Sequence, residues 1–303
     1  MTVRRISEQV SVAIGPFFSW QTIKVLFKLR VVALLLFAAV AGAFLGAGGW
    51  PGLTNLLVLI VVGGLGAAGS SAINEYLERD QDALMRRTSH RPLVVGIFPF
   101  PGWIPVLGAA MIGVPSAVVA LWNPALAFFV LLGAFIYVVI YTIWLKPRTL
   151  LNIVIGGAAG SAAVMSGGAA VGAWTDPGVI VLALLVFLWT PIHFWSLALA
   201  CRDDYSRAGV PMLPVHTTPR QAALWGLLHG GGAALAGLML AVHPALGWLY
   251  SLLALTGTVL LIGQGVRLVR RPDRANAWLV FHTSNAYLSL ILLAVCVDTL
   301  LPL

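Results

Sequence analysis

Long apolar runs alternate with short polar stretches along this chain. A helix needs about 20 apolar residues to cross a bilayer, and nine runs meet that length. They cover approximately residues 31–49, 53–73, 103–121, 124–144, 150–172, 178–200, 222–241, 244–266 and 277–301. The short alternating segments typical of a transmembrane β-barrel do not occur. The pattern therefore predicts an all-α integral membrane protein with nine transmembrane helices.

The basic residues fall on one side of the predicted spans. All 18 lie in segments 1–30, 74–102, 145–149, 201–221 and 267–276, and the intervening turns hold none. This alternation follows the positive-inside rule, so we expect a cytoplasmic N-terminus and a periplasmic C-terminus. With no Arg- and Ser-rich presequence, the chain fits a bacterial inner membrane.

The first 30 residues differ from the rest of the chain. Their apolar stretch Val10–Trp20 is short, has charges on both sides, and carries aromatic residues. This pattern is typical of a helix that lies in the membrane interface. We therefore predict a cytoplasmic and interfacial segment at 1–30, followed by a single nine-helix domain at 31–303.

The composition narrows the class of protein. Of 303 residues, 60% are hydrophobic and only 9% are charged, whereas soluble domains carry about 25% charged residues. This excludes an ordinary soluble enzyme. The net charge of +8 does not indicate a nucleic-acid surface, because the basic residues lie between apolar runs.

Six of the ten acidic residues gather in two of the basic loops. They are Glu75, Glu78, Asp80, Asp82, Asp203 and Asp204. If the second span continues as a helix, Asn74, Glu78 and Asp82 recur at i, i+4 and i+8 and share one face. Such oxygen ligands beside a substrate phosphate are the usual surroundings of Mg²⁺. The alternative is a solvated helix end whose Glu78 or Asp82 pairs with Arg86.

The second acidic pair lies four spans after the first cluster. Asp203 and Asp204 again follow the cytoplasmic end of a predicted helix. This spacing indicates two four-helix pseudo-repeats plus one helix, arranged around a central cavity. Two acidic groups that converge on one phosphate-bearing substrate suit metal-assisted phosphate chemistry.

Longer motifs accompany these acids. They are Asn74, Tyr76, Arg79, Asp80, Asp82, Met85, Arg87 and Thr88; Tyr141-Thr142-x-Trp144-Leu145-Lys146; residues 152–160; His193-Phe194-Trp195; Asp203-Asp204-Tyr205; residues 209–214; and Phe281-His282-x-Ser284-Asn285-x-Tyr287-Leu288. In them the chain resembles the UbiA superfamily of intramembrane prenyltransferases, and within it the protohaem IX farnesyltransferase branch. Glu78 and Ile192 depart from the branch, which has Asp and Pro there, and Ser161–Met165 replaces a Pro-containing turn.

The resemblance implies both a reaction and a site. The reaction is transfer of the farnesyl group of farnesyl diphosphate to the vinyl group of haem B, which gives haem O. The resemblance implies Mg²⁺ as cofactor, with Asn74, Glu78, Asp82 and Asp203 as metal ligands and Asp204 as a further catalytic acid. It implies substrate binding by Arg79, Arg86, Arg87, Lys146, Arg148, His193 and Tyr205. The implied partners are the lipid bilayer and haem A synthase or terminal oxidase assembly proteins.

Several alternatives stay open at this point. A UbiA-type enzyme could instead use an aromatic, quinone-precursor or chlorin acceptor. A transporter is disfavoured because no charged residue lies deep in a span, and a non-catalytic assembly factor would not need both acidic clusters. His193 suits either a hydrogen-bonded structural role or contact with haem iron or a propionate.

Overall fold

The computed structural model describes residues 19–301, and within them the chain is helical with no strand. In that range nine helical segments are long and apolar enough to cross a membrane. They are α3 (Leu29–Ala47), α4 (Leu53–Ala83), α5 (Trp103–Ala120), α6 with its π-helical continuation η1 (Pro124–Phe135, Ile136–Leu145), α7 with α8 (Asn152–Gly156, Ala158–Ala170), α9 (Pro177–Ala200), α12 with η2 (Pro219–Met239, Leu240–Val242), α13 (Trp248–Arg270) and α14 (Arg274–Asp298). The prediction of an all-α protein with nine spans is confirmed.

Three short helices accompany the spans. They are α2 (Trp20–Leu26), which precedes α3, and α10 (Arg202–Arg207) and α11 (Leu213–His216), which follow α9. The interfacial helix predicted over Val10–Trp20 lies outside the described residues except for its last two positions.

Three of the spans begin at a polar cap followed directly by proline. The side-chain oxygens of Asn123, Asp176 and Thr218 accept a backbone N–H from the first turns of α6, α9 and α12 at 3.0–3.2 Å. Such caps satisfy donors that a helix start leaves free, and proline fits the first helical position. Local sequence therefore fixes where these helices start.

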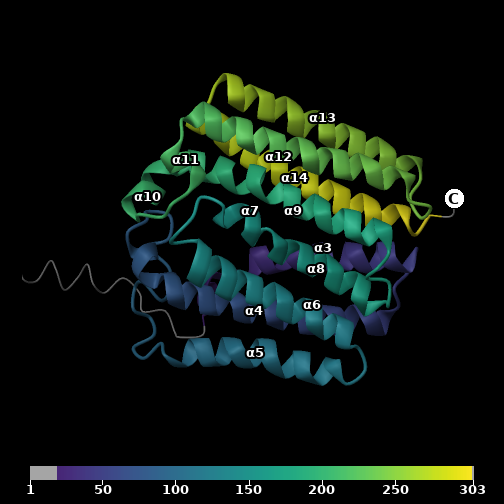
Figure 1. The fold of residues 1–303 in the computed structure, drawn as a ribbon. Coiled ribbons are helices and arrows are strands. Elements are labelled where there is room, and N and C mark those ends of the chain that lie inside the picture. Colours follow the sequence, from purple (N-terminus) through teal and green to yellow (C-terminus); the bar gives the residue numbers. More distant parts are fainter. Residues whose placement is uncertain (1–18, 302–303) are drawn as a thin grey trace, which may run out of the picture.

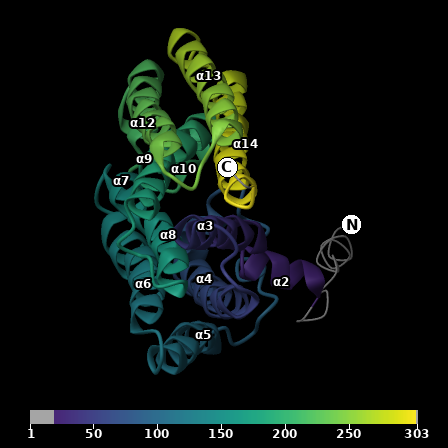
Figure 2. The same cartoon turned by 90° about the vertical axis from the view of Figure 1, so that its right-hand side faces the viewer.

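The spans form two groups around α3 (Figures 1 and 2). One group contains α4, α5, α6 and α8, and the other contains α9, α12, α13 and α14. Glycine allows α3 and α8 to pack closely, since a Cβ at Gly167 would lie 1.8 Å from the Ala39 carbonyl oxygen. Small residues have this role in membrane helix packing. The two acid-bearing helices, α4 and α9, thus belong to different groups.

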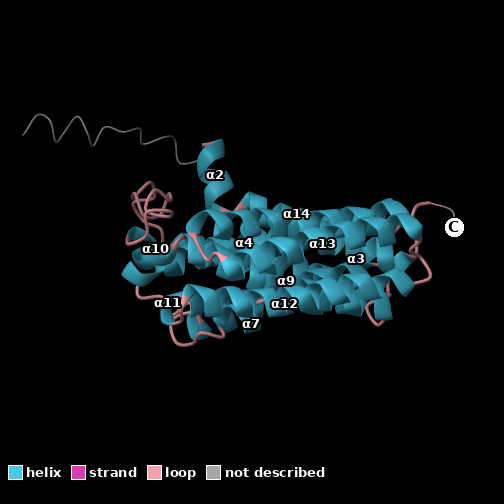
Figure 3. Ribbon diagram, turned by 90° about the horizontal axis from the view of Figure 1, so that it is seen from above, coloured by secondary structure: helices cyan, strands magenta, loops and turns pink. Residues whose placement is uncertain are grey.

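Both acidic clusters lie at the end of the bundle opposite the C-terminus (Figure 1). Figure 3 shows α2 and α10 at this same end. A buried apolar cluster joins the elements there, and its members include Met85 after α4, Ile153 in α7, Trp195 in α9 and Tyr205 in α10. The chain therefore brings its two motif regions together at one end.

Candidate active site

The last turns of α4 carry a buried polar face. The helix continues to Ala83, and Asn74, Glu78 and Asp82 are 1%, 7% and 4% exposed. Their spacing places them on successive turns of one face, as the sequence predicts. A solvated helix end would expose these groups, so this face is part of the protein interior.

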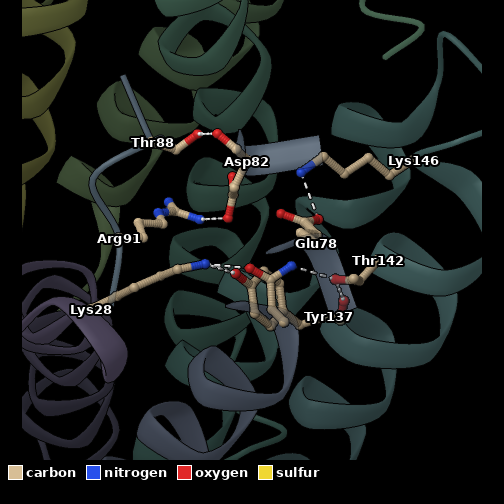
Figure 4. Close-up of polar contacts among 9 residues, drawn as sticks. Lys28, Glu78, Asp82, Thr88, Arg91, Tyr137, Thr142 and Lys146 are labelled. Atoms are coloured by element: carbon tan, nitrogen blue, oxygen red, sulfur yellow. Dashed lines mark hydrogen bonds and ion pairs between the residues drawn. The ribbon is translucent and has the colours of Figure 1, made fainter. Parts of the chain in front are cut away.

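Three basic side chains bind this face, from the α2–α3 junction, the loop after α4 and the end of η1 (Figure 4). Lys146 Nζ lies 2.6 Å from Glu78 Oε1, and Arg91 Nη1 lies 2.5 Å from Asp82 Oδ2. Lys28 Nζ donates a hydrogen bond to Asn74 Oδ1. These pairings replace the alternative of local ion pairs with Arg86. The site is therefore assembled by tertiary structure.

The turn after α4 positions Arg91. Thr88 Oγ1 donates a hydrogen bond of 3.0 Å to the Asp82 carbonyl oxygen, which folds the chain back over the helix end. Burial alone would lower the pKa of Arg91, but the charges of Asp82 and Glu75 more than offset this and raise the pKa above its usual value. Arg91 therefore stays a cation beside Asp82.

The π-helical segment η1 lines the other side of the site. In it the Thr142 hydroxyl donates to the Tyr137 carbonyl oxygen at 2.8 Å and accepts from Asn74 Nδ2 at 2.9 Å. This contact turns the Asn74 carbonyl oxygen toward Lys28. Burial alone would lower the pKa of Lys146 just after η1, yet the Glu78 carboxylate raises it. π-helical segments are frequent at functional sites, and this one holds two partners of α4.

Lys28 occupies the junction between α2 and α3. Its backbone is left-handed, with φ 47° and ψ 48°, and it is the one non-glycine residue among 19–301 with positive φ. A single left-handed residue costs roughly 1–2 kcal/mol, and such strain is found at functional sites. Burial, together with the like charge of Arg91, lowers the pKa of Lys28 to about 8. Sequence reasoning missed Lys28 because nothing local links it to Asn74.

The second acidic cluster is arranged differently from the first. Asp204 Oδ2 accepts the Arg87 backbone N–H at 3.3 Å and its other oxygen pairs with Arg207, so the two motif loops touch. Asp203 is exposed, and Tyr205 is buried in the apolar cluster at this end. The structure brings Asp204, but not the Asp203 side chain, into contact with the first motif region. The roles of both acids stay predictions.

The other predicted arginines lie around the site. Arg79 donates to the Tyr76 carbonyl oxygen at 2.9 Å and stacks on that ring, and Arg148 donates to two carbonyl oxygens at the end of η1 at 2.8 Å. Arg86 and Arg87 have exposed side chains. Of the predicted substrate-binding cations, Lys146 pairs with the buried Glu78, whereas Arg79 pairs at 3.8 Å with the exposed Asp80. Substrate contacts by the others stay predictions.

His193 is buried between α9 and α14. Its Nδ1 lies 3.0 Å from Ser284 Oγ, and its ring stacks on Trp189 and Phe281 at centroid distances of 4.4 and 4.5 Å. Trp189 Nε1 also donates to the Ser284 carbonyl oxygen at 2.7 Å. These contacts give His193 a packing role, and its contact with haem stays a prediction.

Comparison with known proteins gives the family. Residues 35–291 match the UbiA prenyltransferase family. This chain belongs to that family. It is 42% identical over 275 residues to the protoheme IX farnesyltransferase of Metallosphaera sedula. The aligned region covers 90% of this chain and 94% of that relative. It is 41% identical over 278 residues to protoheme IX farnesyltransferase 2 of Paramagnetospirillum magneticum, with 91% and 96% covered.

Solved structures share the UbiA fold. A digeranylgeranylglyceryl phosphate synthase superimposes with a TM-score of 0.75 at 16% identity, over 92% of this chain and 98% of the other. A UbiA homologue of Aeropyrum pernix K1 superimposes with a TM-score of 0.66 at 20% identity, over 89% of this chain and 96% of the other. The Archaeoglobus fulgidus homologue bound to DMAPP and Mg²⁺ superimposes with a TM-score of 0.59 at 17% identity, over 88% of this chain and 99% of the other. These structures confirm the predicted fold, and the match over residues 35–291 confirms the predicted family and its prenyltransferase class.

The residues of this UbiA site suit a magnesium–diphosphate ligand. Among the described residues no three His, Cys, Asp or Glu side chains form a metal centre by themselves. Mg²⁺ typically takes one or two carboxylates and completes its shell with water and substrate phosphate, and Asn74, Glu78 and Asp82 offer this donor set. Glu75 is 0% exposed, and within the described part of the chain neither of its oxygens has a hydrogen-bond partner. A buried carboxylate without a partner is costly, so the site has spare capacity for a cation.

Proposed function

We propose that this chain transfers the farnesyl group of farnesyl diphosphate to a vinyl group of haem B and forms haem O. The observation that carries the proposal is its identity of 42% and 41%, over nine-tenths of its length, to two proteins named protoheme IX farnesyltransferase. The buried face of Asn74, Glu78 and Asp82 supports the same chemistry, because it suits a metal-bound diphosphate.

In this proposal each group on the α4 face has a defined task. Asn74, Glu78 and Asp82 hold Mg²⁺ at the buried face, and Asp203 or Asp204 completes the set from the other loop. When bound, Mg²⁺ neutralises the charge that develops on the departing diphosphate. Lys146 and Arg91 lie beside the same acids and donate to diphosphate oxygens, as charge-assisted bonds to phosphate do.

The reaction balances with water as the one further reactant. The bond between farnesyl C1 and the diphosphate oxygen breaks, and the diphosphate leaves with the electron pair. The vinyl group supplies the electrons for the new carbon–carbon bond, and water then adds its hydroxyl to the resulting carbocation and releases a proton. The buried walls of the site keep other water from the allylic cation.

The protein is an integral membrane protein, and we propose the bacterial inner membrane as its location. The site lies at the end of the bundle opposite the C-terminus (Figure 1), where the basic loops also lie. By the positive-inside rule this end faces the cytoplasm, which supplies soluble Mg²⁺. Delivery of product to haem A synthase or to oxidase assembly proteins stays a prediction.

One assay tests the proposal. Purified protein is incubated with Mg²⁺, farnesyl diphosphate and haem B, and mass spectrometry measures haem O. The expected result is haem O that disappears when EDTA is added. Prenylation of 4-hydroxybenzoate in place of haem B would contradict the proposed acceptor and favour a UbiA enzyme with an aromatic acceptor.

A further inference from the structure

Glu75 is the buried acidic residue of α4 that the proposed mechanism does not use. It lies three residues before Glu78 and seven before Asp82, so all three share the buried side of the helix. Its carboxylate is fully buried and, within residues 19–301, accepts no hydrogen bond and forms no ion pair. Buried carboxylates are normally paired. We therefore expect the Glu75 carboxylate to have a partner in another conformation of the protein.

Lys28 is placed to be that partner. Leu26, at the end of α2, packs in one apolar cluster with Ala72, and Tyr76 of α4 lies against the same cluster. The junction of α2 and α3 therefore lies beside the turn of α4 that carries Asn74 and Glu75. The Glu75 carboxylate acts to raise the pKa of both Lys28 and Arg91. Of these two cations, Arg91 is already paired with Asp82, whereas Lys28 bonds only neutral groups among the described residues.

The buried acids of the site lie among an equal number of basic side chains. Three buried carboxylates, Glu75, Glu78 and Asp82, face three cations, Lys28, Arg91 and Lys146. Lys28 bonds the same Asn74 oxygen that a metal ion would need. A divalent cation at that oxygen would repel the ammonium, because like charges a few ångströms apart in a protein interior interact strongly.

We propose that Glu75 receives the Lys28 side chain when a divalent cation takes the Asn74 oxygen, and so sets the affinity of the site for that cation. This inference rests on the proposed metal-dependent function. Glu75 is then a positioning residue that acts through Lys28. The strained backbone of Lys28 lies at the point where its side chain changes partner.

The test measures Mn²⁺ binding to the full chain in detergent, by electron paramagnetic resonance of the free ion. Glu75→Gln removes the receiving charge and should weaken Mn²⁺ binding about tenfold, within the usual range of such couplings. Glu75→Asp keeps the charge and should retain most of the affinity. Asp80→Asn is the matched control, since it removes the same charge from the exposed side of the same helix.

A double-mutant cycle separates the proposal from simpler roles. Lys28→Gln removes the competitor, so it should tighten Mn²⁺ binding, and Glu75→Gln should then have little further effect. Equal weakening by Glu75→Gln in both backgrounds would overturn the proposal and make Glu75 itself a metal ligand. A lower melting temperature with unchanged affinity would also overturn it, as would an equal effect of Asp80→Asn.

The same measurement distinguishes this inference from the proposed function. If the unmodified chain binds no Mn²⁺, the metal-dependent function fails. If it binds Mn²⁺ and the Glu75 and Lys28 variants match it, this inference alone fails. Should Glu75→Gln not fold, tighter binding by Lys28→Gln is the remaining expected result, and its absence overturns the exchange.

Discussion

Lys146 Nζ lies 2.6 Å from Glu78 Oε1 and thereby joins the turn after η1 to α4. Both side chains are nearly buried, at 13% and 9% exposure. Removal of one partner of a buried ion pair leaves an uncompensated charge, whereas removal of both is often neutral. This pair therefore couples the stability of the bundle to the electrostatics of the site.

We expect Lys146→Met to destabilise the protein by about 3 kcal/mol, the usual cost of breaking a buried pair from one side. Thermal unfolding in detergent measures this loss. The double variant Lys146→Met/Glu78→Gln should recover most of the stability but not the activity, because both groups contact the proposed ligand. A double variant as unstable as the single one would contradict a charge-based cause.

Asp82→Ala should lower kcat for haem O formation by at least about 100-fold, the typical effect of removing one group that stabilises transition-state charge. Single-turnover mass spectrometry measures the rate. Asp80→Asn serves as the matched control, because Asp80 is 91% exposed on the same helix. Normal turnover by the Asp82 variant would contradict the metal assignment.

Ser284→Ala and His193→Phe together should separate a packing role of His193 from contact with haem. Ser284→Ala removes the hydrogen bond to Nδ1 and leaves both ring stacks in place, so we expect a stability loss of about 1 kcal/mol. If packing is the main role, His193→Phe should keep the Soret spectrum of added haem B. A changed Soret band at unchanged melting temperature would instead assign His193 to haem.

Gly167→Ala should disrupt the packing of α3 against α8. Its new methyl group would lie 1.8 Å from the Ala39 carbonyl oxygen, and backbone cannot yield as a side-chain tip can. Overpacking costs about 1–3 kcal/mol and occasionally more, so we expect the upper end. Gly231→Ala, with nothing within 4 Å of its Cβ, should not lower the melting temperature. Equal losses in both variants would contradict the packing argument.

The bundle and the α4 face follow from patterns that local sequence carries. Apolar runs fix the spans, and the i, i+4, i+8 spacing of Asn74, Glu78 and Asp82 holds once α4 is helical to Ala83. The same reasoning could not find Lys28, which lies 46 residues from its partner Asn74. Only tertiary packing brings such residues together.

For the arginines, sequence reasoning suggested ligand contacts where the structure shows contacts within the protein. Charge alone makes Arg79 and Arg148 candidates for phosphate binding, yet each donates to carbonyl oxygens of nearby helical turns. The exposed side chain of Asp203 depends on the path of α10, which spacing does not define. A π-helical segment gave no local signal either, although it sets the direction of Thr142 and Lys146.

The dispersed origin of the three site cations has a consequence for biosynthesis. During insertion α4 is made before residue 146, so Glu78 and Asp82 are made before the Lys146 and Arg91 side chains that neutralise them. Carboxylates without partners are costly in a membrane, so the end of the nascent α4 must stay at the aqueous surface until synthesis has passed η1. Glu78 thus gains its partner Lys146 only after α5, α6 and η1 have been made.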